Sequence, residues 1–278
     1  MATSDGHAPG PPPGSPGFGP LGRVMAPLAI ISLIWIIFVA VVPINSWFPE
    51  ATRQAVSVDN LFRFMLAVGG AIIIFVEGLT LAFVVQYRRR PSDPEDAVGV
   101  QSHGNTRVEI AWSAGPALLL VILAVASLAV WGDEHSVQKD PLHLDVTGYQ
   151  FGWQFSLPQY GVKNLDGVTD IMALPINRAV YVSERSPDVI HSFWVPEFRI
   201  KQDVVPGLVT HEEFTPSEIG TYRVICTEFC GVGHSGMVAK IRVVSDADFI
   251  TFLRRHHATS LPPGAPSAAL VGASRSVH

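Results

Sequence analysis

The chain has 278 residues, a formal net charge of −5 and a charged fraction of only 15%. Its mean hydropathy of +0.31 is high, because charged residues make up about a quarter of a typical soluble protein. This composition excludes a wholly soluble protein and a basic nucleic-acid-binding protein, so we expect membrane segments and no nucleic acid among the partners.

The chain begins with a tail that cannot bury a core, followed by an apolar segment. Residues 1–20 are rich in Gly, Pro, Ser and Ala, and we expect residues 1–23 to be disordered. Residues 24–42 are almost uninterruptedly apolar, and a helix of this length spans about 28 Å, close to the thickness of the hydrocarbon core. Two interpretations stay open: a retained transmembrane helix, or an export signal flanked by Arg23 and removed from the mature protein. The length of the run and the absence of a clean Ala-x-Ala cleavage site favour the retained helix.

Two further apolar segments predict a transmembrane helical hairpin over residues 61–131. The first segment covers residues 61–86, and the second covers residues 108–131. Each is long enough to cross the hydrocarbon core as a helix. The chain is therefore expected to be a multi-pass protein of the lipid bilayer.

The arginines next to this hairpin predict its orientation. The loop between the two segments carries Arg88, Arg89, Arg90 and Arg107, whereas the polar loop before the first segment carries a single arginine. The positive-inside rule places the arginine-rich loop in the cytoplasm. Everything after the hairpin then lies on the outer face of the membrane.

Two carboxylates in these segments require an explanation. Glu77 lies eleven residues before Arg88, where a lipid-facing carboxylate is costly, so we expect it to face protein and to be paired or protonated. Glu109 lies at the start of the last segment. Its carboxylate either reaches the headgroup region, pairs with Arg107, or has a functional role.

From residue 133 the sequence changes to short β-type runs separated by turn residues. Several runs alternate between apolar and polar residues, which predicts a β-sandwich or barrel. The fold class is therefore membrane-anchored α plus all-β. The predicted strands cover residues 142–155, 178–183, 190–195, 208–214, 221–226 and 238–244. Ser245 caps a predicted helix over residues 246–256, and residues 257–278 are expected to form a disordered tail.

One short loop, residues 226–237, carries both cysteines of the chain. It reads Cys-Thr-Glu-Phe-Cys-Gly-Val-Gly-His-Ser-Gly-Met, with His234 four positions after Cys230 and Met237 three positions later. Two thiolates, an imidazole and a thioether form a soft ligand set that suits copper. A disulfide between Cys226 and Cys230 has no use for the histidine and the methionine. A mononuclear zinc site with two cysteines and two histidines stays open as an alternative.

This loop resembles the binuclear copper (CuA) loop of subunit II of the haem-copper respiratory oxidases. The family pattern Cys-x-Glu-x-Cys-x3-His-x2-Met is present at every specified position. Residues 105–112, residues 149–155 and residues 188–207 also resemble the corresponding segments of that family. The resemblance implies a cupredoxin-like Greek-key β-sandwich that holds the copper centre, over residues 133–256.

The resemblance also implies a set of ligands for two copper ions. Five side chains and the backbone carbonyl of Glu228 make up that set. The side chains are those of His191, Cys226, Cys230, His234 and Met237. The carboxylate of Glu228 is then expected to reach a magnesium ion at the contact with oxidase subunit I.

The family further implies a route for electrons and one for protons. A tryptophan at the position of Phe151 receives electrons from cytochrome c in known members, but this chain has phenylalanine there. Trp153 and Tyr149 are the alternative aromatic residues for this role. Glu109 matches a glutamate at the mouth of a proton pathway into subunit I.

The charge of the outer domain favours a basic electron donor. Residues 133–250 contain sixteen Asp and Glu against nine Lys and Arg, a net charge of −7. Such a surface steers a cationic partner, and cytochrome c or a tethered cytochrome c domain fits this requirement.

These features predict the electron-accepting subunit of a cytochrome c oxidase in a bacterial cell membrane, with its copper domain on the outer face. The chain has no Cys-x-x-Cys-His haem motif, so reduction of O2 and proton translocation are expected in a complex with subunit I and other oxidase subunits. The copper-containing subunit of a nitric oxide reductase and a membrane-tethered copper carrier are the alternatives. A quinol oxidase subunit is disfavoured, because it usually lacks the copper ligands.

Overall fold

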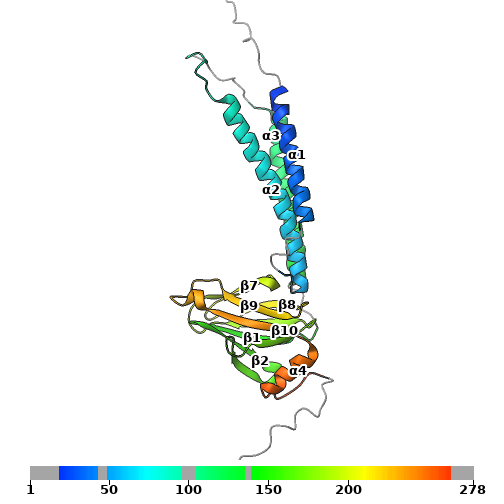
Figure 1. Cartoon of the computed structure of the whole chain (residues 1–278), viewed down its shortest axis with the longest axis vertical. Coiled ribbons are helices and arrows are strands. Elements are labelled where there is room, and N and C mark those ends of the chain that lie inside the picture. The colour runs from blue at the N-terminus through cyan, green and yellow to red at the C-terminus, as the bar shows by residue number, and fades with distance from the viewer. Residues whose placement is uncertain (1–18, 43–48, 96–103, 135–138, 264–278) are drawn as a thin grey trace, which may run out of the picture. The chain divides into compact units, whose positions relative to one another are not determined.

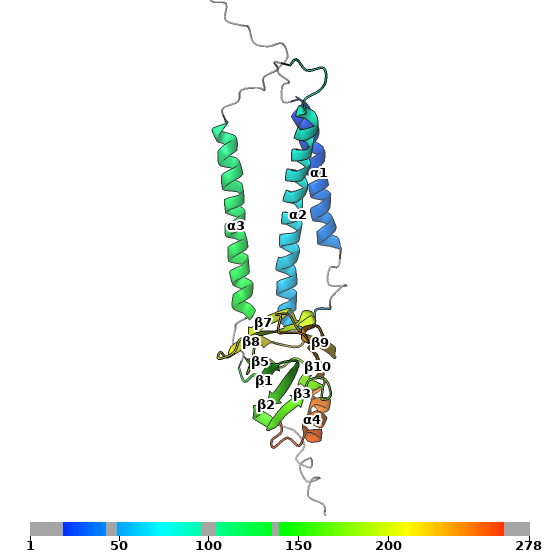
Figure 2. The same cartoon turned by 90° about the vertical axis from the view of Figure 1, so that its left-hand side faces the viewer.

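The computed structural model describes residues 19–42, 49–95, 104–134 and 139–263 (Figures 1 and 2). Contacts between residues divide the chain into two compact units. One comprises Met1–Val42 and Arg63–Trp112, and the other comprises Pro43–Phe62 and Ser113–His278. The disorder that we predict for residues 1–18 and 264–278 falls outside the described residues.

Three long helices precede the β-strands, and each is long and apolar enough to cross a membrane. They are α1 (Gly19–Val41), α2 (Arg53–Tyr87) and α3 (Thr106–Glu134). Both α1 and α2 begin before the apolar runs at residues 24 and 61, because helical hydrogen bonding does not require apolar side chains. Helix α1 therefore starts within the segment that we predict to be a disordered tail.

Helix α1 packs against one face of α2 through small residues and two hydrogen bonds. The Ser32 hydroxyl donates to the Ala71 carbonyl and the Trp35 indole donates to the Leu66 carbonyl, both at 3.1 Å. A Cβ at Gly70 would lie only 2.1 Å from the Trp35 ring, so this close approach requires glycine. Small residues bring membrane helices together in this way.

The first turns of α2 are part of the β-domain unit. The Thr52 hydroxyl caps the helix by accepting from the Ala55 amide at 3.1 Å, and it donates to the Phe198 carbonyl at 3.0 Å. Further along, Asp59 accepts from Nε and a terminal nitrogen of Arg199, both at 2.7 Å. The sequence predicts only a polar loop here, because these contacts are made to residues about 140 positions away.

The β-domain is a sandwich of two five-stranded sheets, which confirms the predicted fold class. The strand orders are β3-β2-β1-β5-β8 and β4-β10-β9-β6-β7. Two pairs of strands are parallel, β1 with β5 and β4 with β10, while the other pairs are antiparallel. The strands are β1 (Leu142–Tyr149), β2 (Gly152–Leu157), β3 (Val162–Asp166), β4 (Met172–Pro175), β5 (Val180–Arg185), β6 (His191–Val195), β7 (Ile200–Val204), β8 (Thr210–Phe214), β9 (Gly220–Cys226) and β10 (Val238–Val244).

A terminal helix, α4 (Asp246–Arg255), covers part of the sandwich core beside β4. The Ser245 hydroxyl accepts from the Asp248 amide at 3.2 Å, so the predicted cap is confirmed. Residues 257–263 are described and attached to the domain, although we predict disorder there. The Thr259 amide donates to the Tyr160 carbonyl at 2.8 Å, a local contact that composition does not reveal.

One buried carboxyl, Glu184, interrupts the apolar row that β5 turns towards the core. Thr210 Oγ1 lies 3.1 Å from Glu184 Oε2 and 2.9 Å from the Asp203 carbonyl, which can only accept. A hydroxyl has one proton, so both contacts are satisfied when Glu184 is itself protonated. Burial, together with the nearby charges of Glu212 and Asp203, raises the pKa of Glu184 to about 9.

We predict that Glu184→Gln stabilises the chain at pH 8 and has little effect near pH 4. The folded-state pKa of Glu184 exceeds its unfolded value, so unfolding releases a proton at intermediate pH and the free energy of unfolding falls as pH rises from about 4.5 to 9. The gain at pH 7 should be on the order of 3 kcal/mol. Denaturant unfolding of the full chain in detergent, from pH 4 to 9, measures it.

The matched control is Glu212→Gln, which removes a neighbouring charge but leaves Glu184 in place. This control should reduce the pH dependence only in part. A Glu184→Gln chain that keeps the full wild-type pH dependence would contradict the assignment.

Candidate metal centre

Two elements bring the predicted metal ligands together. Strand β6 begins at His191, and β9 ends at Cys226, where the loop to β10 starts. The two strands are antiparallel neighbours, with Phe193 opposite Cys226. Pairing of these strands therefore places His191 next to a cysteine that follows it by 35 residues.

The loop folds back so that its second half meets the first. A short 3-10 helix, η4 (His234–Gly236), precedes β10, and the Cys226 amide donates to the Met237 carbonyl at 3.2 Å. This bond closes the loop at its base. The loop thus returns Met237 to the neighbourhood of both cysteines.

The structure brings all five predicted side-chain ligands into one cluster. Atoms of His191, Cys226 and Cys230 that could bind a metal lie within 4.8 Å of one another. The two sulfurs are 3.9 Å apart, and Cys226 Sγ lies 3.9 Å from His191 Nδ1. Cys230 Sγ lies 3.6 Å from His234 Nδ1 and 3.7 Å from Met237 Sδ. Each thiol therefore has its own imidazole.

The donor atoms fit soft metal ions better than a disulfide. Both cysteines are free thiols, and 3.9 Å is far beyond the bonded S–S distance of about 2.05 Å. It is less than twice the metal–thiolate distance of about 2.3 Å, so one ion can bind both sulfurs. Burial and the neighbouring Cys226 thiol raise the pKa of Cys230 to about 11, so metal binding must displace a proton.

Glu228 takes part through its backbone and leaves its side chain in solvent. Its carbonyl oxygen lies 3.3 Å from Cys226 Sγ. The carboxylate belongs to an exposed residue. The chain therefore presents this carboxylate outwards, where a partner can reach it.

Asp188, which the sequence does not single out as a site residue, orients His191. Its Oδ1 lies 2.9 Å from His191 Nε2, which leaves Nδ1 facing Cys226. Burial alone would raise the pKa of Asp188. Hydrogen bonds from His191, from the Gln150 and Val189 amides and from Ser186 outweigh it and lower the pKa to about 2. The spacing of three residues before a candidate ligand is the signal that could have identified Asp188.

The turn between β1 and β2 holds the loop from the other side. The Gln150 side-chain amide donates to the Cys230 carbonyl at 2.5 Å, and its backbone amide donates to Asp188 Oδ2 at 2.7 Å. The Phe151 ring lies against the backbone of Gly231 and Gly233, where a Cβ would come within 3.0 and 2.5 Å of it. The aromatic segment predicted from the sequence is thus part of the site.

The three candidate aromatic residues lie in different environments. Phe151 is 38% exposed and touches the loop, whereas Trp153 is only 1% exposed and stands edge-on to His191 with ring centroids 6.1 Å apart. Tyr149 is half-buried. A residue that meets a soluble donor must reach the surface, so these positions favour Phe151 over Trp153.

Glu109 acts as a helix cap rather than as the partner of Arg107. Its Oε1 accepts from the Asn105 amide at 3.0 Å, and the Asn105 side chain accepts from the Arg107 amide at 3.1 Å. This reciprocal arrangement starts α3. The role of Glu109 in a proton pathway stays a prediction.

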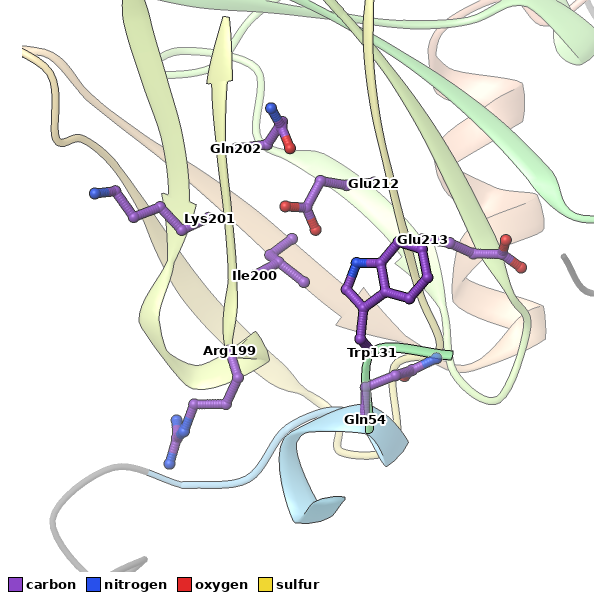
Figure 3. A pocket seen from close by; sticks show the side chains of 8 residues that line it. All are labelled: Gln54, Trp131, Arg199, Ile200, Lys201, Gln202, Glu212 and Glu213. Carbon is purple, nitrogen blue, oxygen red and sulfur yellow. The ribbon is translucent and has the colours of Figure 1, made fainter. Parts of the chain in front are cut away.

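A separate polar cavity of about 340 Å³ lies elsewhere in the β-domain unit (Figure 3). It shares no lining residue with the cysteine cluster. Its walls are formed by Gln54, Trp131, Arg199, Ile200, Lys201, Gln202, Glu212 and Glu213. The mixture of cationic and acidic side chains does not provide the soft donors of a copper site.

Comparison with known proteins associates the chain with one family. A family profile described as cytochrome c oxidase subunit II, transmembrane domain, matches residues 42–130, and one described as its periplasmic domain matches residues 120–244. The cytochrome c oxidase subunit 2 of Thermostichus vulcanus is 32% identical, and the match covers 78% of this chain and 80% of that protein. The Synechocystis protein of the same name is 28% identical, covering 76% and 77%.

Solved structures include the periplasmic domain of subunit II of cytochrome oxidase from Bradyrhizobium japonicum. It is 29% identical, with a TM-score of 0.41, and the match covers 43% of this chain and 96% of that domain.

We predict that Gly233→Ala weakens metal binding although Gly233 offers no ligand. The new Cβ would lie 2.5 Å from Cγ and Cδ2 of Phe151, so the ring must leave its place on the loop. Loss of such a supporting contact typically costs about 10-fold to 100-fold in metal affinity. Competition with a copper chelator measures the affinity of the full chain in detergent.

Gly236→Ala is the matched control, because a Cβ at Gly236 of the same loop meets nothing within 4 Å. It should bind copper as the wild type does. Equal losses in the two variants would show that the loop tolerates no alanine, and that the Phe151 contact is not the cause.

Proposed function

Because the chain belongs to the cytochrome c oxidase subunit II family, we propose that it accepts electrons from cytochrome c at a binuclear copper centre and passes them to haem in subunit I. The observation that carries this proposal is the pairing of each of two free thiols with its own imidazole. Reduction of O2 to water, coupled to proton translocation, then takes place in the partner subunit.

The cluster divides into two similar halves, which supports two ions rather than one. Cys226 is accompanied by His191 and the Glu228 carbonyl, and Cys230 by His234 and Met237. We propose these six groups as the copper ligands. When bound, the copper pair supplies a one-electron acceptor and donor whose charge is shared over both ions. A single zinc site with two cysteines and two histidines does not require Met237 as a ligand.

The protein contributes rigidity and exclusion of water. Cys226, Cys230, Met237 and His191 are all buried. Asp188 holds the His191 ring in one orientation, and Gln150 holds the carbonyl of Cys230. Groups fixed in this way move little when the charge of the centre changes, which favours rapid electron transfer.

Contacts with partners follow from what the site leaves exposed. The Phe151 ring is partly exposed to solvent and also contacts the loop. We therefore propose it as the place where electrons from cytochrome c enter. The exposed Glu228 carboxylate is proposed to reach magnesium at the contact with subunit I. The net charge of −7 over residues 133–250 supports a basic donor. We place this domain on the outer face of a bacterial cell membrane.

The deciding experiment is metal analysis combined with electron paramagnetic resonance on the full chain. Two coppers per chain, with one unpaired electron shared equally between them, are expected. Cys226→Ser should lose the shared-electron spectrum, because one of the two sulfur donors of the cluster is gone. Ser235→Ala changes an exposed residue of the same loop and should keep it. One zinc per chain, or an unchanged spectrum in the Cys226→Ser chain, would refute the proposal.

A second prediction concerns the route of electrons. Phe151→Ala should slow reduction of the copper centre by cytochrome c about tenfold, a barrier increase of about 1.4 kcal/mol, while Phe151→Trp should keep the rate. Stopped-flow measurements with reduced cytochrome c follow this step. Phe229→Ala removes another ring of the loop, one that is 77% exposed, and should have little effect. If Phe229→Ala causes the larger loss, electrons do not enter through Phe151.

A further inference from the structure

The carboxylate of Glu77 lies in the middle of an apolar helix and has no partner within the described residues. It belongs to α2 and precedes Arg88 by eleven residues, or about 16 Å along the helix axis. The hydrocarbon core is about 30 Å thick, so Glu77 lies near its centre if Arg88 marks one surface. Glu77 is exposed, and its carboxylate makes no hydrogen bond or ion pair to another described residue.

After Arg23, helix α1 offers no free polar side chain, because the two that it carries there, Ser32 and Trp35, are already engaged. The Ser32 hydroxyl and the Trp35 indole donate to backbone carbonyls of α2. The remaining side chains of α1 after Arg23 are apolar apart from the thioether of Met25. At the depth of Glu77, Leu28 of α1 lies against Gly78, which is about 100° round α2 from Glu77.

The sequence of α3 offers no donor at the matching depth either. In the predicted hairpin both helices are anchored by the arginine-rich loop, and the residue eleven positions after Arg107 is Leu118. Every side chain from Pro116 to Ala126 is apolar. None of the residues that the structure describes therefore supplies a hydrogen-bond donor to Glu77, which leaves another chain as the source of one.

The side of α2 around Glu77 is suited to close approach of another helix. At about 100° per residue, Gly69, Ile73, Glu77 and Thr80 fall within an arc of about 80°. A Cβ at Gly69 would meet nothing within 4 Å, and the Thr80 hydroxyl is satisfied by the Val76 carbonyl at 2.9 Å. We call these four residues the Glu77 face.

We propose that the Glu77 face binds a transmembrane helix of a partner subunit that presents a hydroxyl or basic side chain to the Glu77 carboxylate. A carboxylate inside the hydrocarbon core is costly unless it is paired, and small residues let the two helices approach each other. The proposal rests on the proposed function only in taking the partner to be another subunit of the same oxidase.

The test uses the full chain, produced with its partner subunits in the native membrane and purified in mild detergent. Glu77→Leu should lower the amount of co-purified partner subunits at least tenfold, because the buried donor of the partner is left unpaired. Glu77→Gln should retain them, since an amide both accepts and donates hydrogen bonds. Phe83→Leu, outside the Glu77 face, is the control and should behave as wild type.

Copper content and the copper spectrum are measured on the same samples and should stay unchanged, which separates this proposal from the copper assignment. Full co-purification of partner subunits with the Glu77→Leu chain would overturn the proposal. Loss of the partner subunits from the Glu77→Gln chain to the same extent as from the Glu77→Leu chain would also overturn it, because an amide can still pair with the partner's donor.

A photo-crosslinking residue introduced at Ile73 provides a second measurement that does not depend on stability. It should form adducts with one partner subunit, and the same probe at Phe83 should form few. Adducts from Ile73 only to lipid or to this chain's own α3 would contradict the proposed face.

Discussion

The separation of two thiols in a single short loop is the constraint on which the site depends. Cys226 and Cys230 keep their sulfurs 3.9 Å apart without a covalent bond, so the surrounding structure must fix them. Pairing of β6 with β9 positions one side of the loop, and the bond from the Cys226 amide to the Met237 carbonyl closes its base. Gln150 and Asp188 then connect the β1–β2 turn to the same cluster. Sites built on rigid elements with such supporting hydrogen bonds keep their geometry.

The same principle applies where the chain enters the β-domain from its N-terminal side. Thr52 and Gln54 use their side chains to bond the backbone of distant strands and loops, and the Asp59–Arg199 pair is largely buried. Charged hydrogen bonds that are shielded from water are stronger than exposed ones. The first turns of α2 are consequently held by the domain that carries the metal cluster, and they belong to its structural core rather than to a flexible connection.

Local chemistry explains which features the sequence predicts. Strand β10 has the predicted bounds, because its residues alternate between buried and exposed positions, and Ser245 caps α4 as expected. The continuous strand predicted over residues 142–155 is instead a hairpin, β1 and β2, whose turn at Gln150 and Phe151 lacks the usual turn residues. The sequence does not predict strands β3, β4 and β7, because they are short and weakly patterned. The ligand types follow from the loop sequence, whereas the roles of Asp188 and Gln150 depend on tertiary contacts that spacing alone does not determine.

The chain has two carboxyl groups in apolar surroundings. The fold provides a hydrogen-bond partner for Glu184 but none among the described residues for Glu77. Glu184 sits between strands that bring Thr210 beside it, so the fold supplies a hydroxyl and the proton stays on the carboxyl group. Glu77 sits on a helix whose backbone polar groups are already satisfied along its length, and it has no side-chain partner among the described residues. A single helix cannot create a polar environment for its own mid-membrane side chain. An assembly in which a partner helix supplies a polar group, as we propose, would provide that environment.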